Sequence, residues 1–121
     1  MTDWRAVAIG FIVEFVVGLI GFVIPGVGHL VAGLLGGGVA GYLASRGVAS
    51  GAWHGLLAGA IGGIVLSILF SVAITVLGTI TAGPLGPLFG GAVFLAAIAG
   101  SLLLAVDSAI GGAIGGWLAG D

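Results

Sequence analysis

Charged side chains are scarce along this chain of 121 residues, and they lie far apart. They are Asp3, Arg5, Glu14, Arg46, Asp107 and Asp121. The charged share is 5%, whereas a soluble domain has about 25%. A chain with so few charges cannot cover its surface with polar groups, which predicts that its solvent is lipid.

The apolar runs between these charges contain most of the 27 glycines of the chain. A disordered backbone in such runs would leave amides unpaired in hydrocarbon, so only helices or a closed barrel can form there. Barrel strands need alternating apolar and polar residues, and the chain has too few polar residues to supply them. We therefore expect an all-α protein, a polytopic bundle of transmembrane helices that forms one domain over residues 1–121.

Glycine, proline and short polar stretches divide the chain into predicted helices at about 4–24, 27–45, 52–77 and 88–118. Pro25 and Gly26 end the first helix, and the stretches SRGVAS (45–50) and TAGPLGP (81–87) form the later turns. About 20 residues span a bilayer, so the first two helices fit, and the longer two must tilt, kink or protrude. The sequence thus predicts four membrane spans.

The two arginines predict the orientation of these spans. With four spans, the N-terminus, the second connection and the C-terminus share one side, where Arg5 and Arg46 both lie. By the positive-inside rule this side is cytoplasmic, so we expect a multi-pass protein of the cell membrane with both termini in the cytoplasm. The residues expected to anchor this boundary in the membrane interface are Trp4, Tyr42, Trp53, His54 and Trp117.

From residue 51 to residue 79, every fourth position carries glycine or a small hydroxyl residue. This ladder consists of Gly51, Gly55, Gly59, Gly63, Ser67, Ser71, Thr75 and Thr79. Small residues let helix backbones approach closely, which favours helix association in lipid. Because a spacing of four advances about 40° per step around a helix, we expect the ladder to face more than one neighbour, in the bundle and in another subunit.

Similar spacing in the second and fourth predicted helices indicates small-xxx-small (glycine zipper) packing throughout the bundle. The glycines expected to form these contacts are Gly33, Gly37, Gly41, Gly55, Gly59, Gly63, Gly112 and Gly116. Such surfaces also favour a homo-oligomer. The expected partners are therefore the lipid bilayer, further copies of the chain and other membrane subunits.

Two acidic residues lie inside the predicted spans. Glu14 is about ten residues into the first helix, roughly 15 Å deep, where a charge costs about 3 kcal/mol or more. Asp107 reaches a similar depth from the end of the fourth helix. Two close carboxyls do not both ionise readily. They predict either a proton or cation site, or a protonated acid that bonds a serine, a carbonyl or the other carboxyl and fixes the bundle.

The chain lacks the residues that several other functions require. The chain has no cysteine, which excludes a disulfide framework, a thiolate nucleophile and cysteine metal ligands. It has no lysine for a phosphate-binding loop and no basic run for nucleic acid. His29 and His54 are expected at opposite membrane edges, too far apart to share a metal. No nucleophile with a base and an orienting group is evident, so we expect no enzyme activity and no cofactor.

Four stretches of the chain carry a resemblance to a known family: MTDWRAVAIGF, PGVGHLVAGLLGGGVAGYLA, GAWHGLLAGAIGG and AVDSAIGGAIGG. The chain resembles an uncharacterised family of small glycine-rich membrane proteins from halophilic archaea. The resemblance implies a host with multimolar cytoplasmic salt, and it brings no assigned activity.

These observations lead to two interpretations of function. The first is a structural or interaction membrane protein that self-assembles through its glycine seams, as a small subunit of a larger membrane complex. The alternative is a proton- or cation-conducting channel or transporter that uses Glu14 and Asp107. A water-filled path to both carboxyls would favour the alternative, and a dry, closed bundle would favour the first.

Overall fold

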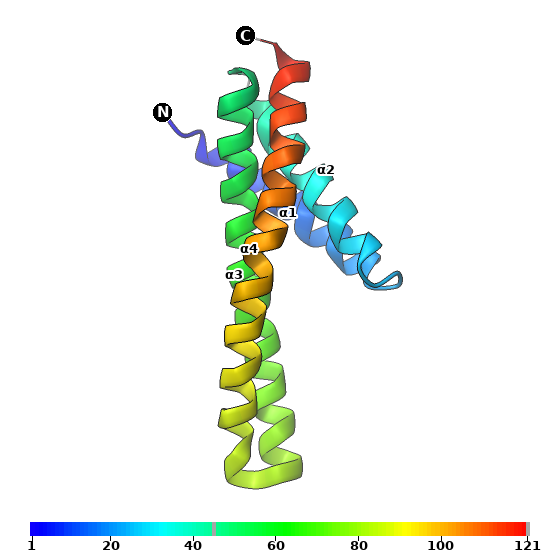
Figure 1. Ribbon diagram of the computed structural model, residues 1–121, viewed down its shortest axis with the longest axis vertical. Helices are drawn as coiled ribbons and strands as arrows, with labels where there is room; N and C mark the ends of the chain where they lie inside the picture. Colours follow the sequence, from blue (N-terminus) through cyan, green and yellow to red (C-terminus); the bar gives the residue numbers. More distant parts are fainter. Residues whose placement is uncertain (45, 121) are drawn as a thin grey trace.

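The computed structural model describes residues 1–44 and 46–120, which are helical along almost their entire length (Figure 1). The elements are α1 (Trp4–Gly21), α2 (Val27–Ala44), α3 (Gly47–Ala82), the short 3₁₀ helix η1 (Gly83–Leu85) and α4 (Gly86–Ala119). The described residues contain no strand. The prediction of an all-α protein is therefore confirmed.

Local chemistry sets both ends of α1. Asp3 caps the first turn, where its carboxylate accepts hydrogen bonds from the backbone N–H groups of Arg5 at 2.9 Å and Ala6 at 3.3 Å. The helix ends three residues before the predicted Ile24, because the backbone after Gly21 continues as tighter turns with bonds three residues apart. Gly26 then reverses the chain with a φ of 84°, a conformation that favours glycine.

The helices α3 and α4 are longer than predicted, with 36 and 34 residues. At 1.5 Å per residue they measure roughly 54 and 51 Å, far more than the ~30 Å core of a bilayer. Most of the predicted turn at 81–87 is helical. Gly83, with a φ of 59°, redirects the chain, and Pro84 and Pro87 lie in the first turns of η1 and α4, where no amide hydrogen is needed.

The number of candidate membrane spans differs from the prediction. Three stretches among the described residues are long and apolar enough to cross a membrane: Trp4–Gly21, Val27–Ala44 and Gly47–Ala119. The expectation of four separate stretches was wrong, because the turn at 81–87 does not interrupt the helical conformation. The third stretch, of 73 residues, contains both α3 and α4.

Two hairpins of unequal length make up the molecule (Figure 1). The helices α3 and α4 run antiparallel along the long axis and make the most extensive contact between any two elements. The shorter α1–α2 hairpin packs at an incline against only the half of α3–α4 that lies nearest the termini (Figure 1). The other half, which ends at η1, projects alone with large apolar side chains exposed, among them Leu77, Ile80, Leu88 and Leu95.

Small residues fill the interior of the bundle. The buried apolar residues are six alanines and Val7, and many of the buried helix positions are glycine. Helix backbones therefore pack directly against one another rather than through layers of large side chains. Such contact is how helices associate where burial from water contributes little.

Within the chain, the ladder from residue 51 to residue 79 follows one neighbour, α4; its expected contact with another subunit stays a prediction. A Cβ on Gly51, Gly55, Gly59 or Gly63 would meet atoms of residues 101–116. Farther along, Ser71 donates a hydrogen bond of 2.9 Å to the Gly90 carbonyl, while Thr75 and Thr79 lie against Gly90 and Gly86. A seam with a period above 3.6 stays on one partner when two helices wrap around each other with a right-handed twist. The prediction assumed straight helices.

Candidate functional site

All four helices meet at the side chain of Glu14, in the middle of α1. Its Cβ packs so closely on Gly36 of α2 that a Cβ at residue 36 would collide with it. A Cβ on Gly62 of α3 would lie 3.5 Å from Glu14 Oε1. On α4, Ser108 Oγ lies 3.2 Å from Glu14 Oε2. Glycine at positions 36 and 62 thus makes room for the carboxyl between the helices.

Ser108 is fully buried and has two hydrogen-bond contacts through one hydroxyl. Its Oγ lies 2.8 Å from the backbone carbonyl of Gly55 and 3.2 Å from Glu14 Oε2. The carbonyl can only accept, and a serine hydroxyl has one hydrogen to donate. Both contacts are satisfied together when Glu14 is protonated and donates to Ser108, which donates to Gly55. The geometry therefore fits a neutral Glu14.

The second predicted acid, Asp107, lies beside this junction on α4. Its carboxyl faces Gly33 of α2, where a Cβ would approach Asp107 Oδ2 to 2.5 Å. This oxygen is buried and has no hydrogen-bond partner among the described residues. Asp107 is also close enough to Glu14 for the two carboxyls to interact electrostatically. The structure thus brings the two sequence-predicted acids to the same region of the bundle.

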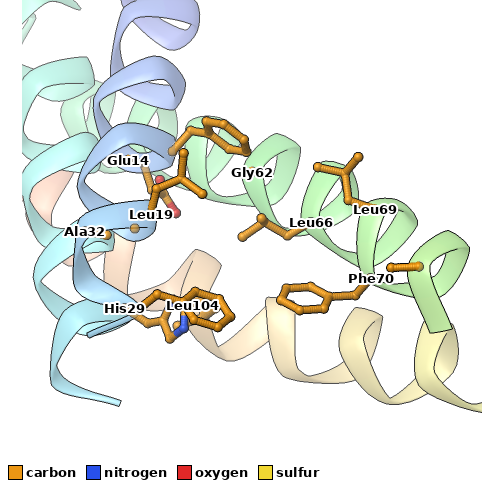
Figure 2. Close-up of a pocket in the computed structure, with 13 residues that line it drawn as sticks. Glu14, Leu19, His29, Ala32, Gly62, Leu66, Leu69, Phe70 and Leu104 are labelled. Carbon is orange, nitrogen blue, oxygen red and sulfur yellow. The ribbon is translucent and has the colours of Figure 1, made fainter. Parts of the chain in front are cut away.

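A cavity of about 230 Å³ opens beside Glu14, between the two hairpins (Figure 2). Glu14, Leu19, Ala32 and His29 line it from α1 and α2, while Leu66, Leu69 and Phe70 line it from α3 (Figure 2). Leu104 of α4 contributes to the same wall. The cavity is apolar apart from the Glu14 carboxyl and the His29 imidazole.

Three rings gather at the end of this cavity away from Glu14. The Phe22 ring packs edge-on against His29 at 5.7 Å and stacks on Phe70 at 5.9 Å, measured between ring centroids. His29 thus lies in an aromatic cluster. Sequence reasoning missed this cluster, because nothing in the spacing of Phe22 and Phe70 shows that the two hairpins meet there.

The eight glycines predicted to pack helices all lie against another helix. Gly33, Gly37 and Gly41 of α2 face α4. Gly55, Gly59 and Gly63 of α3 also face α4, whereas Gly112 and Gly116 of α4 face α3. At most of these positions a Cβ would come within 3 Å of a neighbouring backbone. Any larger residue would therefore separate the helices.

The predicted interface anchors behave in two different ways. The aromatic side chains of Trp4, Tyr42, Trp53 and Trp117 are more than half exposed. His54, in contrast, is only 2% exposed, so its side chain does not reach the surface as the expected interface anchor would. Its Nε2 accepts a 2.8 Å hydrogen bond from the Asp3 backbone N–H, and its Nδ1 donates to the Ser50 carbonyl at 2.6 Å.

The N-terminal segment explains why His54 is buried. Three contacts fasten this segment across the start of α3: Asp3 to His54, the Trp53 indole N–H to Thr2 Oγ1 at 3.2 Å, and Arg46 Nη1 to the Met1 carbonyl at 3.0 Å. Periodicity along one helix cannot reveal these contacts, since they join residues about 50 positions apart.

One family of proteins matches this chain, the family of unknown function DUF5518, and the match covers residues 4–118. The chain belongs to this family. No curated protein and no solved structure matches it. Because the DUF5518 match covers α1 to α4 almost completely, Glu14, Asp107 and Ser108 all lie within the matched region.

The chemistry that this member of DUF5518 can support depends on a small number of polar groups. Within the described residues, no three histidine, aspartate or glutamate side chains lie close enough to hold a metal ion together. The junction can hold a proton between Glu14 and Ser108, and the buried Oδ2 of Asp107 can accept a further hydrogen bond. The cavity can hold an apolar group next to the Glu14 carboxyl.

Proposed function

We propose that this chain is a structural membrane protein of the cell membrane, in which a protonated Glu14 fixes the four helices to one another. The observation that carries this proposal is that Ser108 Oγ lies 2.8 Å from the Gly55 carbonyl and 3.2 Å from Glu14 Oε2. The hydroxyl has only one hydrogen to donate to these two oxygens. A neutral acid satisfies both contacts and avoids the cost of a charge inside the membrane. The resulting chain of hydrogen bonds links α1, α4 and α3.

In this proposal α3 and α4 each cross the membrane, so that the chain has four crossings and both termini in the cytoplasm. The antiparallel arrangement of the long hairpin supports this view (Figure 1). Four exposed aromatic side chains also support four crossings, because they suit an aromatic belt at the membrane interface: Trp4, Tyr42, Trp53 and Trp117. The two arginines lie at the same end of the bundle, as the positive-inside rule would require. A halophilic archaeal membrane is the proposed setting.

Self-association completes the proposed role. The part of α3–α4 near η1 has no cover from the α1–α2 hairpin and exposes large apolar residues on its surface (Figure 1). Gly91 and Gly100 on α4 have open space where a side chain would be. Helices of a second copy or of another membrane subunit could approach closely there through glycine zipper contacts.

The proposal is tested by exchanging the neutral acid for a neutral amide. Glu14→Gln retains a donor for Ser108, so its thermal midpoint in detergent or nanodiscs should stay close to that of the wild type. Glu14→Leu removes the donor and should lower the midpoint. A Glu14→Gln protein that is as unstable as Glu14→Leu would show that the ionised carboxylate, and not a protonated acid, holds the helices.

A second candidate function is a proton- or cation-conducting path through Glu14 and Asp107. The buried and unpartnered Oδ2 of Asp107, close to Glu14, favours it. The decisive measurement is flux into proteoliposomes in multimolar KCl or NaCl, with empty liposomes as reference. Flux that is lost in both Glu14→Gln and Asp107→Asn supports conduction. Wild-type flux equal to that of empty liposomes excludes it under those conditions.

A further inference from the structure

The cavity beside Glu14 combines a large apolar wall with one free acceptor. Glu14 Oε2 contacts Ser108, whereas Oε1 has no hydrogen-bond partner within residues 1–44 and 46–120. Oε1 is the oxygen nearest Gly62, which lines the cavity. Neither arginine neutralises it, since both are exposed and Arg46 donates to the Met1 carbonyl. A ligand that suits this site is apolar and carries one cationic donor.

We propose that this cavity binds a lipophilic amine, with the ammonium group at Glu14 Oε1 and the apolar body among Leu66, Leu69 and Phe70. An ammonium group supplies both the hydrogen bond and the positive charge that the carboxylate lacks. The rings of Phe15 and Phe70 line the same space, and aromatic faces attract cations. The site is therefore selective for an amine over a neutral molecule of the same shape.

The volume of the cavity limits the size of this ligand. An apolar cavity of about 150 Å³ accommodates benzene, so the 230 Å³ here holds roughly nine non-hydrogen atoms. An arylalkyl amine such as 2-phenylethylamine has this size. The Phe22, His29 and Phe70 cluster lines the cavity at the end away from Glu14, where the aromatic end of such a ligand would lie.

Binding of the amine exchanges one cation for another. In the empty protein Glu14 donates its proton from Oε2 to Ser108. When an ammonium binds at Oε1, Glu14 ionises and this proton passes to the solvent, one for each amine that binds. The Ser108 hydroxyl then shares its one hydrogen between the Gly55 carbonyl and Glu14 Oε2. The other titratable groups facing Glu14 are Asp107 of α4 and His29 of α2, and the part of α3 that lines the cavity carries none. This inference shares the protonated Glu14 of the proposed function but does not require its structural role.

Calorimetric titration of the wild-type protein in nanodiscs, with empty nanodiscs subtracted, provides the first test. We expect 2-phenylethylamine to bind saturably and at least tenfold more tightly than 2-phenylethanol, its neutral isostere. Titration in buffers of different ionisation enthalpy should show release of one proton per amine. Equal binding of amine and alcohol would overturn the proposal and assign the cavity to apolar molecules such as lipid chains.

Three variants provide the second test. Glu14→Gln should weaken amine binding at least tenfold. Gly62→Val should also weaken it at least tenfold, since a Cβ at residue 62 makes only ordinary contact with Glu14 Oε1 and the added methyl groups take space beside this oxygen, where the ammonium would bind. Gly38→Val is the matched control, because a Cβ at residue 38 also makes only ordinary contact and residue 38 does not line this cavity. Unchanged binding in Gly62→Val would overturn the proposal.

The same variants separate this inference from the proposed function. A Glu14→Gln protein that is stable but does not bind amine agrees with both. A Glu14→Gln protein that unfolds contradicts the structural proposal, and the comparison of amine with alcohol on the wild type then decides the inference alone. A stable Glu14→Gln protein that binds amine as well as the wild type contradicts the inference alone.

Discussion

Gly37 of α2 lies so close to Ser108 of α4 that a Cβ on residue 37 would collide with the Ser108 carbonyl oxygen. The atom in the way belongs to a helix backbone, so it cannot turn aside as a flexible side chain would. The contact also belongs to the Glu14 junction, since Ser108 contacts Glu14 and Gly36, the residue before Gly37, packs on it. Residue 37 therefore sets the distance between α2 and α4 at the candidate site.

Replacing Gly37 with alanine should destabilise the protein, because the two helices must move apart to accommodate one methyl group. Overpacking of this kind costs about 1–3 kcal/mol. Denaturation in mixed micelles measures the change in the free energy of unfolding. Gly38→Ala is the control, since a Cβ on this neighbouring residue of α2 makes only ordinary contact at 3.6 Å, and it should be neutral or slightly stabilising. Equal losses for the two variants would contradict the close contact at residue 37.

The link between Ser108 and Glu14 predicts a measurable coupling. Single variants Ser108→Ala and Glu14→Leu each remove one partner of the 3.2 Å contact. In a double-mutant cycle the two changes should be non-additive, by about 0.6 kcal/mol and at most ~1.7 kcal/mol, the range found for hydrogen bonds between membrane helices. Simple additivity would show that the contact contributes nothing to the stability of the bundle.

His54→Leu should loosen the N-terminal segment. The variant keeps an apolar body of similar size but leaves the part-buried Asp3 N–H without its 2.8 Å acceptor, which costs about 0.5–1.5 kcal/mol, the net value of a typical hydrogen bond. Hydrogen exchange of residues 3–7 by mass spectrometry reports the effect, and faster exchange there is expected. Trp53→Phe removes only an exposed contact and should change exchange less. Unchanged exchange in His54→Leu would exclude the fastening role of His54.

Labelling of introduced cysteines determines how many times the chain crosses the membrane. With four crossings, cysteines at Thr2, Val48 and Leu118 should react from the cytoplasmic side, and a cysteine at Gly83 from the outside. The native chain contains no cysteine, so each variant has a single reactive thiol. Reaction of Gly83 from the same side as Val48 would show that the α3–α4 hairpin does not cross.

The sequence by itself determined the class of the protein and the residues on which its site is built. Scarce charge and long apolar runs leave helices as the only way to pair the backbone in lipid, and all described elements are helical. The isolated Glu14 and Asp107 stand out for the same reason. These properties depend on residue type and local spacing, which are visible along one segment at a time.

The tertiary structure alone decided which segments meet. That the ladder of α3 follows α4 along its length depends on the mutual wrapping of two helices. The burial of His54 depends on a segment 51 residues away, and the cavity exists because the α1–α2 hairpin covers only half of α3–α4 (Figure 1). A glycine seam shows that a helix can be approached closely, but the approach is equally favourable for any partner with small residues. Only the three-dimensional arrangement selects among the many glycine faces of this chain.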